Sequence, residues 1–205
     1  MYEHILHLGS REHYLDLGGY DGDTVQEFLR ETGGKYGSVT VLEPDVKNFR
    51  KLTKTAERCG WKDMLLLNVG IWNEDTTLSF DNRAGRNSFL SDSGRVTVLV
   101  RSADSLLKDK PCTFMKMDVE GAERQALLGA QETLKIKKPK LAFSGYHRNE
   151  DLFDLPLLLK KIEPAYRIYL RHHPYLPAWE TNFYATADSI DTGHKNFFSS
   201  PKPEI

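Results

Sequence analysis

Short apolar segments alternate with longer amphipathic ones along roughly the first 150 residues, and this alternation predicts the secondary structure. The apolar segments are rich in Val, Leu, Met and aromatic residues, which is typical of strands buried on both faces. A strand followed by a helix, repeated along the chain, is the pattern of a parallel sheet covered by helices. The predicted strands are Tyr14–Leu17, Ser38–Leu42, Met64–Val69, Thr113–Met117 and Lys140–Tyr146.

The segments between these strands have the apolar spacing of helices. In the first, Val25, Phe28 and Leu29 fall on one helical face, and Gly33 and Gly34 supply a stop. The predicted helices are Thr24–Thr32, a helix from Pro44 and Asp45 to Gly60, Ala103–Leu107, Ala122–Lys135 and Asp151–Ile162.

Two parts of the chain depart from the alternation. Strands at Thr76–Phe80 and Arg95–Val100 enclose the polar stretch 81–94, which predicts an inserted hairpin with a long loop that shapes specificity. Tyr166–Arg171 and Asn182–Ala187 have no obvious helix between them, so we expect an antiparallel pair that closes the sheet.

Composition and charge narrow the class of protein. The chain has 205 residues, 40% of them hydrophobic, which suits one domain over 1–200, with an N-terminal extension 1–13 and a flexible tail 201–205. Its 28 basic and 29 acidic residues leave no overall positive charge to attract nucleic acid or a membrane. The apolar runs are too short to span a bilayer, the start lacks the features of a signal peptide, and Cys59 and Cys112 do not form a disulfide scaffold. We therefore expect a cytoplasmic protein.

The turn after the first strand, YLDLGGYDGDT, places glycines where a strand turns sharply into a helix, which is where a backbone approaches a nucleotide closely. It reads DxGxxxG from Asp16 to Gly22 and lacks the first glycine of a dinucleotide fingerprint, because position 17 is Leu. Asp16, Asp21 and Asp23 would repel a pyrophosphate but attract S-adenosylmethionine, which has a net positive charge. Capping of the next helix is the structural alternative for Asp21 and Asp23.

Acidic residues also follow the second and fourth strands. Glu43 stands about 20 residues beyond the glycine turn, where a carboxylate accepts hydrogen bonds from ribose hydroxyls. In KMDVEGAE, Asp118 comes at the carboxyl end of a strand. Glu120 and Glu123 are explained equally well as site residues and as acids that cap the next helix. His147 follows the fifth strand, so we expect it beside Asp118.

Together, LDLGGYDGDT, LEPD, KMDVEGAE, the YH after the fifth strand, YRIYLRHH and WETNFYA resemble the FkbM family of S-adenosylmethionine-dependent methyltransferases. The resemblance spans Tyr14 to Ala187. It implies a Rossmann-like class I methyltransferase fold: a doubly wound, mostly parallel seven-stranded sheet with an antiparallel last strand. It also implies methyl transfer to a hydroxyl, often on a sugar or natural product. Because 13 residues precede the first strand, we expect a minimal cap over the cofactor, or one from a neighbouring subunit of a homo-oligomer.

The resemblance, together with the positions at the predicted sheet edge, assigns roles to residues. Asp118 and His147 are the expected catalytic pair, with His147 the better base near neutral pH. We expect no metal ion, although Asp118, Glu120 and His147 carry ligand atoms that suit a hard divalent cation. The residues expected to contact S-adenosylmethionine are Asp16, Gly18, Gly19, Gly22, Thr24, Glu43, Pro44, Val69, Gly70 and Asp118.

Three other functions fit this sequence less well. A nicotinamide-dependent oxidoreductase conflicts with the acidic turn and its missing glycine. A catalytically inactive interaction module would not need the glycine turn or Glu43. A nucleic-acid methyltransferase lacks a basic and aromatic platform in this sequence. The expected partner is therefore a small molecule with a hydroxyl group.

Overall fold

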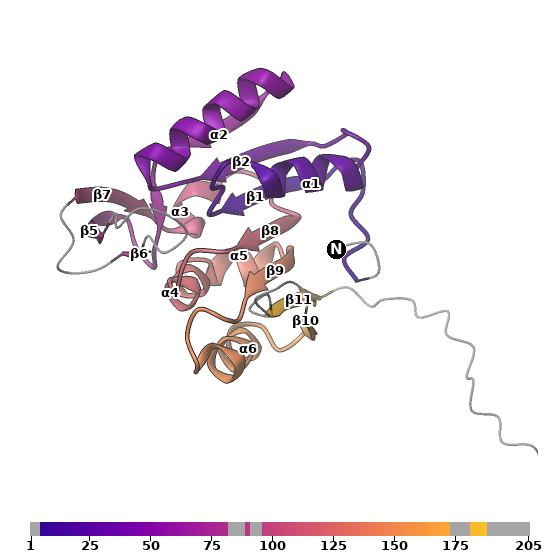
Figure 1. Ribbon diagram of the computed structural model, residues 1–205. Coiled ribbons are helices and arrows are strands. Elements are labelled where there is room, and N and C mark those ends of the chain that lie inside the picture. Colours follow the sequence, from indigo (N-terminus) through magenta and orange to yellow (C-terminus); the bar gives the residue numbers. More distant parts are fainter. Residues whose placement is uncertain (1–4, 82–88, 91–95, 173–180, 188–205) are drawn as a thin grey trace, which may run out of the picture.

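The computed structural model describes residues 5–81, 89–90, 96–172 and 181–187, and its centre is a seven-stranded sheet (Figure 1). The strand order is β10-β11-β9-β8-β1-β2-β3. All neighbouring pairs from β9 to β3 are parallel, whereas β11 is antiparallel to both β9 and β10. The strands are β1 His13–Leu17, β2 Ser38–Leu42, β3 Met64–Leu67, β8 Phe114–Met117, β9 Lys140–Ser144, β10 Arg167–His172 and β11 Thr181–Thr186. The predicted fold class is confirmed, including its antiparallel last strand.

Helices cover both faces of this sheet (Figure 1). On one face Phe28 and Leu52 of the first two helices pack in a cluster with Tyr14, Val41 and Phe114 of the sheet. The opposite face packs against the four later helices. The helices are α1 Asp23–Glu31, α2 Val46–Cys59, α3 Ala103–Leu107, α4 Glu123–Leu128, α5 Gln131–Ile136 and α6 Asp151–Ile162. Alternate residues of each strand face opposite layers, so the continuous apolar strands predicted from sequence fit a doubly wound sheet.

A second, smaller sheet contains the predicted hairpin. Its order is β4-β7-β5-β6, with β4 Gly70–Ile71, β5 Thr76–Asp81, β6 Phe89–Leu90 and β7 Val96–Arg101. The antiparallel pairing of β5 with β7 confirms the hairpin. The rest of the predicted loop 81–94 lies outside the described residues, as do Arg95 and the tail 201–205.

The prediction of one strand over Met64–Val69 was wrong. β3 ends at Leu67, and the chain then enters β4 of the second sheet. Asn68, between these strands, donates from Nδ2 to the carbonyl oxygens of Glu43 (2.8 Å) and Pro44 (3.1 Å). These bonds tie the turn after β3 to the end of β2.

The prediction of one helix over Ala122–Lys135 was also wrong, because the chain forms α4 and α5 with a break at Gly129 and Ala130. A Cβ atom at Gly129 would lie 2.1 Å from the carbonyl oxygen of Trp72. Asp104 then accepts hydrogen bonds from the backbone N–H groups of Glu132 (3.0 Å) and Thr133 (2.8 Å), which starts α5. Both contacts join segments far apart in the sequence.

We expect Gly129→Ala to lower the free energy of unfolding by about 1–3 kcal/mol, since the added methyl must displace backbone. Urea unfolding of both proteins measures the difference. Gly33→Ala is not a matched control, because Gly33 has φ +61°, whereas Gly129 has an ordinary φ of −78°. An unchanged stability for Gly129→Ala would mean that α4 and Trp72 separate at little cost.

Among the described residues, no helix combines the length and apolar character needed to cross a membrane.

Candidate active site at the carboxyl edge of the sheet

The glycine turn brings the ends of β1 and β8 into direct backbone contact. Gly18 has φ +88°, and a Cβ atom there would lie 1.9 Å from the carbonyl oxygen of Asp118. The N–H groups of Gly18 and Gly19 both donate to the carbonyl oxygen of Leu42, at 3.0 and 2.9 Å. Gly22, at φ +93°, leaves room for the ring of Trp61, which a Cβ would approach to 2.7 Å. No other residue type fits position 18, so this turn fixes the distance between two strand ends.

Asp16 lies beneath the turn and is fully buried. Its Oδ2 atom accepts a hydrogen bond from Thr24 Oγ1 (2.6 Å), and its Oδ1 atom lies 3.5 Å from Lys116 Nζ. Burial raises the pKa of Asp16, while the Lys116 ammonium acts in the opposite direction. Lys116 also donates to the carbonyl oxygen of Gly18 (3.0 Å). Asp16 and Thr24 therefore hold the turn from its inner side.

Sequence reasoning missed Lys116, which stands between two methionines in a strand and is only 7% exposed. A lysine in the middle of a buried strand is a signal that a buried carboxylate lies nearby, because an unpaired buried ammonium is costly.

Glu43 is held at the end of β2 with both carboxylate oxygens directed by backbone donors. Oε2 accepts from the N–H of Tyr20 and Oε1 from the N–H of Asp45, each at 2.9 Å. Glu43 is 6% exposed, and burial raises the pKa of this carboxyl to about 7. Each oxygen keeps lone-pair capacity for a further donor such as a ribose hydroxyl. Pro44, Val69 and Gly70 are the other residues predicted at this end of the site; Gly70 is buried in β4.

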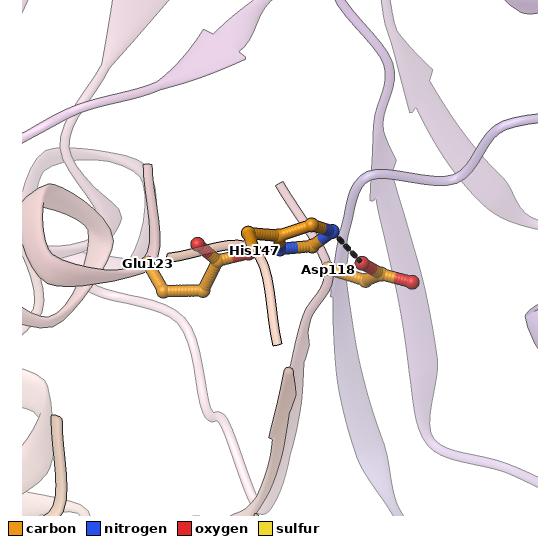
Figure 2. Close-up of side chains that lie close together, drawn as sticks. All are labelled: Asp118, Glu123 and His147. Atoms are coloured by element: carbon orange, nitrogen blue, oxygen red, sulfur yellow. Dashed lines mark hydrogen bonds and ion pairs between the residues drawn. The ribbon is translucent and has the colours of Figure 1, made fainter. Parts of the chain in front are cut away.

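The imidazole of His147 lies between two carboxylates (Figure 2). Its Nδ1 atom is 2.8 Å from Glu123 Oε1, and its Nε2 atom is 3.4 Å from Asp118 Oδ1 and 3.5 Å from Glu120 Oε2. Tyr146 donates to the same Asp118 oxygen at 3.4 Å. The structure thus brings together Asp118 and His147, as the order of the strands led us to expect.

These carboxylates make the cluster strongly acidic. Although burial favours the neutral ring, the hydrogen bond and charge of Glu123, with the charges of Asp118 and Glu120, raise the pKa of His147 to about 9. Asp118 is about one-third exposed at its side chain, whereas that of His147 is 10% exposed. Asp118 is therefore the member of the pair that a ligand meets first.

Glu123 is a member of this cluster for which the sequence left a helix cap and a site residue equally open. Its side chain is buried, and one ligand atom each from Glu123, Asp118 and His147 lies within 4.8 Å of the others. Yet the two carboxylates face opposite ring nitrogens (Figure 2), which is the geometry of a hydrogen-bonded chain. In the metal alternative, Asp118 and Glu120 would share an ion with Nε2 of His147, which both carboxylates face, while Nδ1 would stay with Glu123.

A cavity of about 160 Å³ opens beside Asp118, between α1 and the strands β8, β9 and β11. Its wall includes hydroxyl, amide and carboxylate side chains, which suits a polar ligand. The polar residues lining it include Asp23, Glu27, Asp118, Ser144, Tyr146 and Asn182.

Comparison with solved structures places this fold among methyltransferases. Methyltransferase FkbM from Methylobacillus flagellatus KT is 30% identical, with a TM-score of 0.75 over 88% of this chain and 45% of that protein. The chain thus spans less than half the length of this relative. An O-methyltransferase from Bacillus cereus in complex with SAH is 13% identical (TM-score 0.54; 86% of this chain, 74% of that one). An rRNA methylase from Streptococcus thermophilus, also 13% identical, has a TM-score of 0.56 (87% and 88%) and supports the fold alone.

Sequence comparison gives the family. A search of curated protein sequences found no match. Residues 16–176, however, match the family described as the methyltransferase FkbM domain, a span that includes the glycine turn, Glu43 and the His147 cluster. The chain therefore belongs to the FkbM methyltransferase family.

Proposed function

We propose that this chain transfers a methyl group from S-adenosylmethionine to a hydroxyl group of a small molecule, such as a sugar or another natural product. One observation carries the proposal: a histidine and an aspartate, 3.4 Å apart, lie at the sheet edge that also holds the glycine turn and Glu43. This arrangement supports a cofactor site with a proton acceptor beside it.

The residues at this edge fit the cofactor. Gly18 and Gly22, both at positive φ, shape the turn at the ends of β1 and β8, and Glu43 offers directed carboxylate oxygens for the ribose. The acids Asp21, Asp23 and Asp118 complement a net positive ligand. S-adenosylmethionine bound at this edge would supply a methyl group activated by its sulfonium, with the thioether S-adenosylhomocysteine as the leaving product.

The chain contributes alignment and a proton acceptor. We infer that the acceptor hydroxyl gives its proton to Nε2 of His147 as its oxygen bonds to the methyl carbon. Asp118 then stabilises the imidazolium and orients the acceptor. Because the pKa of His147 is near 9, the neutral ring is a minor form at pH 7, so the rate should rise with pH. A cationic cofactor beside the ring favours its neutral form.

The cavity beside Asp118 is the proposed acceptor site. Ser144 and Asn182 line it and can exchange hydrogen bonds with a hydroxylated ligand. The two acids of α1, Asp23 and Glu27, line its other side. This polar lining favours a sugar-like acceptor over an apolar one.

Binding and product analysis together test the proposal. Calorimetry should show binding of S-adenosylhomocysteine and none of NAD, which separates the methyltransferase from the nicotinamide-dependent alternative. Mass spectrometry of hydroxylated acceptors incubated with S-adenosylmethionine should then show one added methyl group. Cofactor binding without any methylated product across sugars and phenolic or polyketide alcohols would favour the inactive module.

We expect Glu43→Ala to weaken S-adenosylhomocysteine binding by about 1.5–3 kcal/mol, the usual size of hydrogen bonds to a charged acceptor. Calorimetry on the folded variant measures the loss. The control is Glu27→Ala, at an acid that lines the proposed acceptor cavity. Its affinity for S-adenosylhomocysteine should be closer to that of the parent. Equal affinity of Glu43→Ala and the parent would remove Glu43 from the cofactor site.

A further inference from the structure

Glu123 makes contacts that a helix cap does not need. It lies in the first turn of α4 with its side chain 1% exposed. Oε1 accepts from the N–H of Val119 at 2.9 Å and lies 2.8 Å from Nδ1 of His147. Oε2 is buried and has no hydrogen-bond partner in the part of the chain that the structure describes. A neutral Gln of the same length could accept from the N–H of Val119 without burying a charge.

We propose that Glu123 is a positioning residue that holds Nδ1 of His147 and thereby directs Nε2 toward Asp118 and the acceptor hydroxyl. The inference rests on the proposed function, in which His147 accepts the proton. It adds a third member, from a different element, to the catalytic pair.

The position of the ring between its neighbours supports this role. Asp118 and Glu120, after β8, both face Nε2. Glu123 lies at Nδ1, on the other side of the ring from Asp118 (Figure 2). Asp151, at the start of α6, also lies near enough to interact electrostatically with His147. Its Oδ2 atom accepts from the N–H of Arg148 at 2.9 Å, so its carboxylate is bound next to the ring.

The hydrogen bond to Glu123 determines which nitrogen carries the proton in the neutral ring. A carboxylate can only accept, so Nδ1 must donate, and the lone pair is left on Nε2. When Nε2 takes the proton of the acceptor hydroxyl, both ring nitrogens carry protons and both face carboxylates. The same logic governs the acid that orients the histidine of a catalytic triad.

The test begins with the ring itself in the parent protein. Nitrogen-15 NMR of histidine-labelled protein, with His147→Gln to assign the signal, reports the pKa and tautomer of His147. Above pH 9 we expect the proton on Nδ1. A neutral ring protonated on Nε2 would overturn the proposal, whether or not any variant folds.

Glu123→Gln removes the charge and keeps the size of the side chain. We expect the pKa of His147 to fall by about one to three units and the neutral ring to lose its preference for Nδ1–H. The matched control is Glu120→Gln, which removes a charge 3.5 Å from Nε2 but should leave the proton on Nδ1.

Kinetics then link the ring to the reaction. In Glu123→Gln the plateau value of kcat should fall by about tenfold or more, with the plateau reached at lower pH, while the acceptor KM changes little. An unchanged plateau and pH profile in the folded variant would reduce Glu123 to a structural residue. If the parent transfers no methyl group to any acceptor, the proposed function fails, and the proposal fails with it even where the NMR result stands.

Discussion

Asp118→Asn and His147→Ala are each expected to lower the rate of methyl transfer by about 10²-fold or more, while S-adenosylhomocysteine still binds. The first variant removes the charge that faces Nε2 of His147 at 3.4 Å. The second removes the imidazole that is proposed to take the proton of the acceptor hydroxyl. Both leave the glycine turn and Glu43 unchanged, so the loss should appear in kcat and only weakly in cofactor affinity.

The two substitutions should not be additive. Residues that act as one unit lose their function together, so the double variant should be little slower than the slower single variant. Initial rates at saturating cofactor, with calorimetry on each variant, make the comparison. Near-normal turnover in either single variant would remove that residue from the mechanism. Activity that chelator abolishes and added Mg²⁺ restores would instead assign both residues to a metal ion.

The sequence predicts the site wherever a strand pattern brings a residue to a sheet edge. Asp118 and His147 each follow an apolar strand, and β8 and β9 are neighbours in the sheet. The strand order itself is not in the periodicity; it comes from the family resemblance. With that order, the proximity of Asp118 and His147 follows from chain position alone.

Contacts between distant segments are what the sequence does not predict. The break between α4 and α5 depends on the carbonyl group of Trp72, which approaches Gly129 so closely that no Cβ fits. Alanine and leucine around this position favour a continuous helix, so local propensity gives the wrong answer. The packing of two segments decides against it.

Glu123 illustrates the same limit at the site. An acid in the first turn of a helix is commonplace, because it favours the positive end of the helix dipole. Only the fold shows that this particular acid is buried and reaches Nδ1 of a histidine 24 positions away. Its place in KMDVEGAE leaves a cap and a site residue equally open, and the contact with Nδ1 of His147 is the observation on which the proposed positioning role rests.

The histidine cluster should also make the stability of the protein depend on pH. The pKa of His147 is about 9 in the folded protein, raised from the ordinary 6.5 by three carboxylates. The folded state therefore binds this proton more tightly than the unfolded state does. The stabilisation is fully present below pH 6.5 and is lost as the pH rises through 9.

At about 1.4 kcal/mol per pKa unit, this loss is about 3 kcal/mol at most. Urea unfolding of the parent and of His147→Gln at pH 6 and pH 9.5 isolates it, because groups common to both proteins cancel. The contribution of Glu43, with its pKa near 7, is lost in both proteins as the pH rises from about 4.5 to 7. The advantage of the parent over the variant should shrink by up to that amount between the two pH values. A constant difference would mean that the imidazolium of His147 is no better stabilised in the folded protein than in water. The acids around the ring would then act on the acceptor and not on the imidazole.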